Sequence, residues 1–409
     1  MRIGLLIDDF FPSSGGIGRS VQTQIDELVR LGHQVVLIAP NRHLELPINC
    51  ETYACPTIYI EGLPAHLSVL HHSQRRAKAI TRKWRFDLVH SHTDRGALAL
   101  AARIARLQGI PHVHTFHANI AGTHATVKAA LLGTWSYRAL VLPALRLATK
   151  KRLPAARLPS AQEEPDGLAA RTDWKSLADI AAQVDAWTVP SEFMRELISS
   201  CSANDVPGYV VPTGIARGMQ EALQRVTRQR DDAKVRFLSV GRLAKEKRVD
   251  VMVQAFQRAN LPNAELVLVG DGDQLKHLKA LAGDDSNIKF LGHKKSLEDI
   301  AQELVDADVM VLVSYRFDSQ GIVIVEAAAA GLPLLYCDDR LHFGISADSA
   351  VLTDPDADSI AEGMRVFADD NRRAQMRQAL SSLQSELLPE RTAEKYLDIY
   401  RGLVGDSDV

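Results

Sequence analysis

Short apolar runs alternate with amphipathic segments along the first half of the chain. The runs that we expect to form strands are residues 3–7, 34–39, 87–91, 112–117, 186–189 and 209–211. Between them, apolar residues recur at helical spacing, as in residues 18–31, where they predict an amphipathic helix. Nearly continuous apolar strands that alternate with helices are typical of a parallel sheet covered on both faces.

The same alternation restarts at Val235. The predicted strands of the second half are 235–240, 265–269, 288–291, 309–313 and 332–336, and the predicted helices are 249–259, 274–281, 297–305 and 322–330. A chain of 409 residues is also too long for one ordinary core. We therefore predict an α/β protein with two doubly wound, Rossmann-like domains.

Composition changes along the chain predict the domain limits. We expect an N-terminal domain over residues 1–215, a polar and charged hinge over 216–234, and a C-terminal domain over 235–388. A last helix, at about 392–403 within residues 389–409, should pack back toward the N-terminal domain.

Residues of about 128–173 fit the strand–helix pattern poorly and are interpreted as a basic insertion in the N-terminal domain. Its first part, 128–158, is apolar and basic, and Pro143 interrupts the apolar face. Its second part, 159–173, is rich in proline and acid, so we expect a mobile loop before a helix over 174–184.

The overall composition, 46% hydrophobic and 24% charged, is that of a soluble globular protein. We see no signal peptide and no run of about 18 uncharged apolar residues. The cysteines at 50, 55, 201 and 337 have neither CxxC spacing nor histidines at zinc-site spacing, which predicts free thiols in a reducing compartment. These features predict a cytoplasmic protein.

Charge is distributed unevenly along the chain. Residues 1–212 hold 23 basic and 18 acidic side chains, whereas the remainder holds 25 basic and 32 acidic ones. The segment 95–162 carries ten basic residues and no acid. Such a field suits an anionic membrane surface or a phosphate-bearing ligand, although a solvated basic face without a partner has the same composition.

Two motifs follow predicted strands of the second half, at the sheet edge where ligands bind in doubly wound folds. In the first, Gly241 permits close backbone approach, and Arg242 and Lys247 can both face an anion. In the second, Gly321 precedes the first turn of a helix, whose free amide groups can hold a phosphate. The carboxylates of Asp318 and Glu326 are acceptors suited to the hydroxyls of a sugar and a ribose.

Taken together, the motifs resemble those of the family 4 glycosyltransferases, which have the GT-B fold of two Rossmann-like domains facing a cleft. The resemblance covers most of the chain. The matching segments are 11–12 with 15–16, 31–35, 87–92, 113–117, 189–191, 211–215, 240–247, 268–272, 290–292 and 318–326.

This resemblance implies a role for each candidate site residue. Arg242 and Lys247 would hold the donor diphosphate, and Asp318 and His117 would contact the donor sugar, with His117 beside the reacting centre. These four are the catalytic candidates. Glu326 would bind the ribose, the base would lie near residues 291–293, and the backbone amides of residues 16, 322 and 323 would bind the diphosphate. The full set of remaining donor-site candidates is Gly15, Gly16, Gly241, His293, Gly321, Ile322, Val323 and Glu326.

The family resemblance further implies transfer with retention by front-face attack, with no protein nucleophile, no metal ion and no cofactor beside the nucleotide sugar. One position departs from the family pattern, because Asp318 stands where glutamate is usual and is one methylene shorter. This leaves donor choice open, and a sugar-nucleotide binding protein without activity remains an alternative.

Other readings of single motifs are weaker. Gly16-Ile17-Gly18 after the first strand would fit a nicotinamide-dependent oxidoreductase, but the third glycine position holds Val21 and Asn41 follows the second strand in place of an acid. Asp271-Gly272-Asp273 looks like a metal-binding DxD and is better interpreted as a turn that caps the next helix. The histidines at 71, 72, 90, 92 and 114 are interpreted as structural or loop residues.

Within the family, Ser319-Gln320-Gly321 is similar to the Thr-Gln-Gly of diacylglycerol glucosyltransferases. This implies transfer of glucose from UDP-glucose to 1,2-diacylglycerol by a peripheral protein on the inner face of the cytoplasmic membrane. Trp84, Trp135 and the segment 131–158 would lie in the membrane interface. The open alternative is a mannosyl- or other hexosyltransferase acting on a phosphoinositide or a soluble glycan; no nucleic-acid partner is expected.

Overall fold

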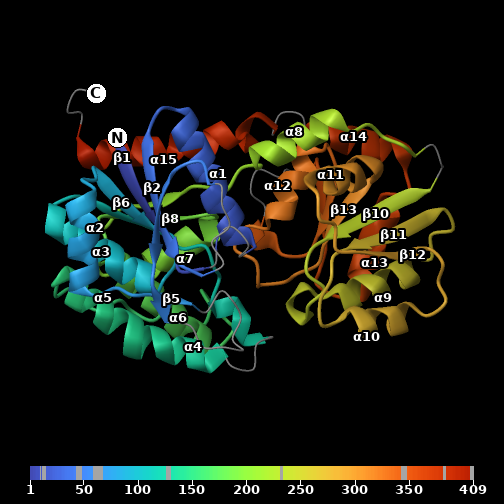
Figure 1. Cartoon of the computed structure of the whole chain (residues 1–409). Coiled ribbons are helices and arrows are strands. Elements are labelled where there is room, and N and C mark those ends of the chain that lie inside the picture. Colours follow the sequence, from blue (N-terminus) through green and yellow to red (C-terminus); the bar gives the residue numbers. More distant parts are fainter. Residues whose placement is uncertain are drawn as a thin grey trace. The chain divides into compact units, whose positions relative to one another are not determined.

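The computed structural model describes residues 1–9, 11, 15–42, 48–58, 68–125, 130–230, 234–341, 348–380 and 384–405. Several positions used in the sequence argument lie outside these residues, namely Pro12, Ser13, Ser14, Lys128 and 231–233. The chain divides into two compact units (Figure 1). Unit 1 comprises Met1–Thr213 and Pro389–Val409, and unit 2 comprises Gly214–Leu388.

Unit 1 is built on a seven-stranded parallel sheet with the order β3-β2-β1-β6-β7-β8-β9. Its strands are β1 Arg2–Leu6, β2 Gln34–Pro40, β3 Glu51–Cys55, β6 Leu88–Ser91, β7 His112–Thr115, β8 Ala186–Val189 and β9 Gly208–Val210. β4 (Thr57–Ile58) and β5 (Val69–Leu70) form a separate antiparallel pair. The sequence pattern located every strand of this sheet except β3, which has one buried residue, Cys55, and no continuous apolar run.

Helices cover both faces of the unit 1 sheet. They are α1 Gly16–Arg30, α2 Gln74–Lys83, α3 Gly96–Gln108, α4 Ala130–Ser136, α5 Leu142–Thr149, α6 Leu168–Ala181, α7 Glu192–Cys201 and α15 Pro389–Val404, with a 3-10 turn at Ala121–Ala125 and a π-helical turn at Tyr137–Val141. α1 and α15 pack on one face, where Ile25 and Tyr400 join the core around Leu5. α2 and α3 pack on the other face, where Ile80 and Leu100 are buried (Figure 1).

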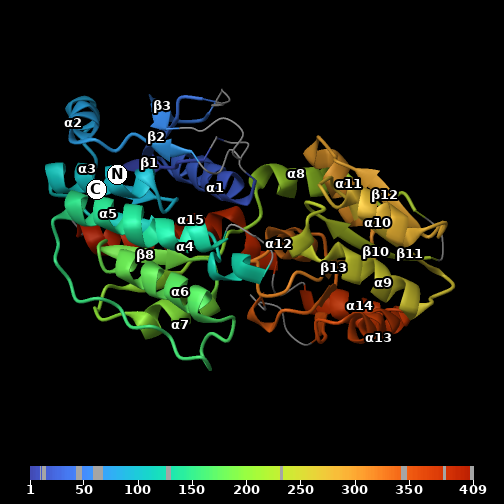
Figure 2. The same ribbon diagram turned by 90° about the horizontal axis from the view of Figure 1, so that it is seen from below.

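The insertion is more helical than the sequence predicts. Pro143 does not end the helical path, because it lies in the first turn of α5, where its missing N–H is not needed. α4, the π-helical turn and α5 therefore follow one another along the outside of unit 1 (Figure 2).

The expected mobile loop at 159–173 is also corrected. α6 begins at Leu168, six residues before the predicted start. The segment before it is held by Glu164, whose buried carboxylate accepts a hydrogen bond of 2.8 Å from Nε1 of Trp174. Trp174 is itself fully buried in the unit 1 core, so a side chain beyond the acid-rich stretch orders it.

Unit 2 contains a six-stranded parallel sheet with the order β12-β11-β10-β13-β14-β15. The strands are β10 Val235–Val240, β11 Ala264–Val269, β12 Ile288–Gly292, β13 Val309–Leu312, β14 Leu334–Tyr336 and β15 Ala350–Leu352. The helices are α8 Arg217–Arg225, α9 Val249–Ala259, α10 Leu275–Ala282, α11 Leu297–Asp306, α12 Ile322–Ala329, α13 Ala357–Val366 and α14 Asp370–Leu380, with 3-10 turns at Lys245–Lys247, Asp339–Leu341 and Gln384–Leu387.

The segment predicted as a hinge, 216–234, begins with a helix. Residues 217–225 form the helix α8, which packs with α11 inside unit 2. Met219 and Ala222 are buried although their surroundings are polar and charged. Two apolar residues three positions apart are enough to pack one face of a short helix against a neighbour. The average composition of the segment does not reveal such a helix.

Both units are doubly wound α/β structures, as predicted. In each sheet the strand order reverses once, between β1 and β6 in unit 1 and between β10 and β13 in unit 2. Ligands of open α/β sheets bind at the carboxyl ends of the strands beside such a reversal. Among the described helices, none has both the length and the apolar character to cross a membrane.

Candidate active site

The candidate diphosphate residues of unit 2 lie at its reversal point. Gly241 and Arg242 follow β10 directly, and Lys247 ends the 3-10 turn that comes next. Backbone bonds fix this loop, because the N–H of Gly241 donates to the carbonyl of Val269 over 2.9 Å. Arg242 is largely exposed and ion-paired with Glu246. Two cations therefore stand within one loop at the edge of the sheet.

Asp318 reaches the same place from β13. Its Oδ1 lies 2.5 Å from Nζ of Lys247, and its Oδ2 accepts a hydrogen bond from the hydroxyl of Ser314. The side chains of Lys247 and Asp318 are 25% and 12% exposed. The structure thus joins two predicted site residues that are 71 positions apart.

Gly321 and the start of α12 complete this part of the site. Gly321 has a φ of 77°, a left-handed conformation that glycine adopts without strain, and it caps α12. The backbone N–H groups of Ile322 and Val323 occupy the first turn, where they have no partner within the helix. Glu326 lies farther along α12 and is buried.

Glycines after β11 hold the cationic loop in place. A Cβ on Gly270 would lie 1.8 Å from the carbonyl oxygen of Gly241, and one on Gly272 would lie 2.2 Å from that of Leu243. Side chains at these two positions would push the loop away. Sequence reasoning gave this segment only the role of a turn, because close backbone packing leaves no periodic signal.

Asp271 in this segment has a local role. Its carboxylate accepts a hydrogen bond of 2.7 Å from the N–H of Gly272. The expected cap of the following helix is not formed by this residue, because α10 begins after Gln274 and has no side-chain cap.

In the described residues there is no group of three or more His, Cys, Asp or Glu side chains suited to a metal ion.

His293 follows β12 and is exposed. The end of β12 is joined to the Gly270 segment, because the N–H of Gly270 donates to the carbonyl of Gly292 over 2.9 Å. The predicted base position, the cationic loop and Asp318 are therefore carried by β12, β10 and β13, all at the carboxyl edge of one sheet. This is the order in which a base, a diphosphate and a sugar would be met.

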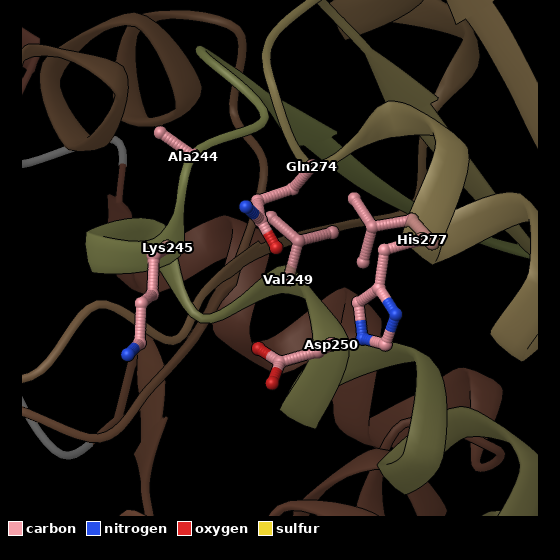
Figure 3. A pocket seen from close by; sticks show the side chains of 7 residues that line it. Ala244, Lys245, Val249, Asp250, Gln274 and His277 are labelled. Atoms are coloured by element: carbon pink, nitrogen blue, oxygen red, sulfur yellow. The ribbon is translucent and has the colours of Figure 1, made fainter.

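A small pocket of about 190 Å³ lies on another side of the cationic loop. Figure 3 shows Gln274, the residue before α10, and His277 of α10 opposite Val249 and Asp250 of α9, with Lys245 on the loop beside them. None of the predicted donor residues lines this pocket. Its position therefore does not mark the predicted diphosphate site.

In unit 1, Gly15 and Gly16 come after β1. Gly15 has a φ of 77° and caps α1, and both glycines are exposed. The first turn of α1 therefore presents free backbone amides at the reversal point of the unit 1 sheet.

Two buried aspartates precede this glycine turn. The carboxylate of Asp8 accepts hydrogen bonds from the backbone N–H groups of Leu70 (2.7 Å) and Ala97 (3.0 Å). Asp9 is ion-paired with Arg95. Burial raises the pKa of Asp9 to about 6, against the lowering effect of the Arg95 charge. Sequence reasoning missed both aspartates, because acids after a strand read as ordinary loop residues.

A chain of hydrogen bonds runs through the histidines at the ends of β6 and β7. His114 contacts Asp94 through Nε2 (2.8 Å) and Ser91 through Nδ1 (2.7 Å), and Ser91 also contacts Nε2 of His112 (2.8 Å). Tyr137, from the π-helical turn, donates to the other oxygen of Asp94 over 2.8 Å. The insertion is therefore linked directly to this polar core.

His117 pairs with another histidine of the unit, His92. It follows β7 and Phe116, is partly exposed, and places Nε2 3.0 Å from Nδ1 of His92. Burial lowers the pKa of His117 to about 4, while the carboxylate of Asp94 acts in the opposite direction. His117 is therefore a neutral imidazole at physiological pH.

Family models match both halves of the chain. The model for Glycosyltransferase Family 4 matches residues 14–217, and the model for glycosyl transferases group 1 matches residues 220–382. The chain belongs to glycosyltransferase family 4. The glycosyltransferase reading of the motifs is thus confirmed, whereas the role of each site residue stays a prediction.

Relatives of this glycosyltransferase span nearly its whole length. An alpha-monoglucosyldiacylglycerol synthase of Streptococcus pneumoniae is 24% identical over 82% of the chain and 70% of that protein. A phosphatidyl-myo-inositol mannosyltransferase of Mycolicibacterium smegmatis is 26% identical over 91% and 86%. The solved sucrose-phosphate synthase of Thermosynechococcus elongatus has a TM-score of 0.68 at 18% identity over 98% and 99%, in agreement with the GT-B fold.

Proposed function

We propose that this glycosyltransferase transfers glucose, with retention and without a metal ion, from UDP-glucose to 1,2-diacylglycerol at the inner face of the cytoplasmic membrane. The observation that carries the proposal is an apolar and basic surface on the insertion. The similarity of the chain to two proteins named alpha-monoglucosyldiacylglycerol synthase also supports the proposal.

This insertion surface consists of side chains that α4, the π-helical turn and α5 leave outside the core. Its apolar members are Leu131, Leu132, Trp135, Leu140 and Leu147, which are 59–68% exposed. Its basic members, also exposed, are Arg138, Arg146, Lys150, Lys151 and Arg152. Five large apolar side chains this exposed within residues 131–147 are unusual on a soluble surface and indicate an interaction site.

An anionic bilayer is the partner that this mixture fits. Leucine and tryptophan gain about 1–2 kcal/mol each when their exposed part enters the acyl boundary. Each lysine or arginine near an anionic leaflet adds about 1 kcal/mol. Because residues 95–162 carry no acid, nothing in the segment opposes this attraction. A diacylglycerol acceptor would be available only at such a surface.

The donor edge of unit 2 supports the transfer step. Arg242 and Lys247 can neutralise the charge that develops on the leaving diphosphate, and the first amides of α12 can bind its oxygens. Asp318 then serves as an acceptor for sugar hydroxyls. This assignment needs neither a metal nor a protein nucleophile.

The test is sugar transfer from radiolabelled UDP-glucose by the full chain. Vesicles with diacylglycerol and anionic lipid are compared with vesicles that lack either one. We expect labelled lipid only when diacylglycerol is present, with less label at high salt. Consumption of the donor without labelled lipid would contradict the lipid acceptor.

A variant pair separates docking from chemistry. Trp135→Ser combined with Leu131→Ser should weaken vesicle binding about 30- to 900-fold, since two inserted side chains of about 1–2 kcal/mol each are lost, and should leave UDP binding unchanged. The control is Leu352→Ser in unit 2, where the replaced side chain is 50% exposed. Equal vesicle binding by both variants would show that the insertion does not dock.

A second candidate, mannosyl transfer to a phosphoinositide, is favoured by the relative of M. smegmatis. The same basic surface would suit a phosphoinositide headgroup. Parallel assays with UDP-glucose, UDP-galactose and GDP-mannose decide between the two, because each candidate predicts a single consumed donor.

A further inference from the structure

His92 and His117 lie ring to ring at the carboxyl edge of the unit 1 sheet. His92 follows β6 and His117 comes just after β7, its neighbour in the sheet. The ring centroids are 5.3 Å apart at an angle of 31°, and Nδ1 of His92 is 3.0 Å from Nε2 of His117. His92 is 1% exposed, whereas His117 is partly exposed. The ring of His92 is therefore enclosed by protein, whereas part of the ring of His117 is accessible to solvent.

Both rings are neutral, so a single proton lies between the two facing nitrogens. Burial lowers the pKa of His92 well below its ordinary value, and neighbouring His90 and His114 lower it further. Burial lowers the pKa of His117 as well, and Asp94 is the acid that opposes it. A hydrogen bond between two neutral imidazoles needs one donor and one acceptor.

The other nitrogen of His92 decides the direction of this bond. Nε2 of His92 is buried and has no hydrogen-bond partner among the described residues. If His117 were the donor, His92 would carry its proton on this buried Nε2, where an N–H without an acceptor is rare and costly. If His92 is the donor, its Nε2 is a bare nitrogen and no N–H is stranded.

We propose that His92 is a positioning residue for sugar transfer: its Nδ1–H donates to Nε2 of His117 and thereby holds His117 as the tautomer with its proton on Nδ1. The proposal rests on the proposed function and on the predicted contact between His117 and the donor sugar. With Nε2 occupied by the Nδ1–H of His92, the single proton of the neutral His117 ring stays on Nδ1. His92 itself touches no substrate.

A first measurement needs no variant and no activity. Long-range proton–nitrogen correlation spectra of protein with labelled histidine distinguish a protonated ring nitrogen from a bare one. We expect a protonated Nδ1 and a bare Nε2 for His117, with the same pattern for His92, throughout pH 6–8. A proton on Nε2 of His117 would overturn the proposal.

Variants then connect the tautomer to transfer. In His92→Leu the donor to Nε2 is lost, so the pKa of His117 should rise and kcat should fall about 10- to 100-fold, while KM for the nucleotide sugar changes less than about 3-fold. In His92→Asn the amide nitrogen can take the place of Nδ1, so kcat should recover to within about 3-fold of the wild type. His71→Ala, at an exposed histidine of the same unit, is the matched control.

Different results would contradict the proposed function and the positioning role of His92. If the wild type transfers no sugar from any donor but shows the expected tautomers, the proposed function is wrong and the hydrogen-bond assignment stands. If the wild type is active and His92→Leu keeps both its kcat and the pKa of His117, the positioning role is refuted. If His92→Leu does not fold, the spectra of the wild type and the kcat of His92→Asn still decide.

Discussion

Lys247 and Asp318 form an ion pair at the candidate donor site, and this makes Asp318→Asn an informative perturbation. Nζ of Lys247 is 2.5 Å from Oδ1 of Asp318, and the two side chains are 25% and 12% exposed. A diphosphate that binds Lys247 must compete with this carboxylate. Removing the negative charge should therefore tighten the binding of UDP while it weakens the hold on the sugar.

The size of each effect follows from the geometry. Ion pairs that are partly open to water contribute about 1 kcal/mol, so UDP should bind about 5-fold more tightly to Asp318→Asn. A hydrogen bond from a sugar hydroxyl to a carboxylate contributes about 1.5–3 kcal/mol, so its weakening should lower kcat about 10- to 150-fold. The variant should thus improve nucleotide binding and impair turnover.

Calorimetric titration with UDP and single-turnover transfer measure the two effects separately. Asp273→Asn is the matched control, because Asp273 is an exposed carboxylate after β11 in the same unit. Asp318→Glu restores the residue usual in the family and should keep UDP affinity within about 3-fold of the wild type, since the charge is retained. If Asp318→Asn bound UDP no better than the wild type, Lys247 would not face the diphosphate.

Three further perturbations test the framework of the site. Gly272→Ala should reduce UDP affinity more than about 10-fold, because its Cβ would lie 2.2 Å from the carbonyl oxygen of Leu243 and displace the cationic loop. The control is Gly402→Ala, where no atom lies within 4 Å of the added Cβ. Tyr137→Phe should lower the free energy of unfolding by about 1–2 kcal/mol in urea titrations, since Asp94 loses a buried donor. Asp9→Asn should remove a pH dependence of stability: the folded pKa is raised from 3.8 to about 6, so the stability from Asp9 is fully present below pH 3.8 and is lost as pH rises through 6.

Each of these has an outcome that contradicts it. Normal UDP binding by Gly272→Ala would show that the loop tolerates displacement. An unchanged unfolding midpoint for Tyr137→Phe would place Asp94 in contact with water. For Asp9, the free energy of unfolding of the wild type minus that of the variant should fall by at most about 3 kcal/mol between pH 4 and pH 7; a flat difference would mean that Asp9 stays ionised throughout.

Local patterns in the sequence were sufficient for all strands of the two sheets except β3 and β15, and for the edge that carries the donor motifs. Apolar runs in β1, β2, β10 and β11 are buried on both faces, so hydrophobicity alone locates them. Because the ends of parallel strands meet at one edge, the sequence alone assigns Arg242 and Asp318 to the same region. Family motifs then supplied chemical roles for these residues.

Contacts between distant residues were decided only by the tertiary structure. Glu164 orders an acid-rich stretch through Trp174, and Met219 seats α8 where composition indicated a hinge. The pairing of His92 with His117 depends on the order of β6 and β7 in the sheet and on burial around one ring nitrogen. Short-range periodicity reports which face of an element is apolar, whereas the partner of a buried polar atom is set by packing between elements that are far apart in the chain.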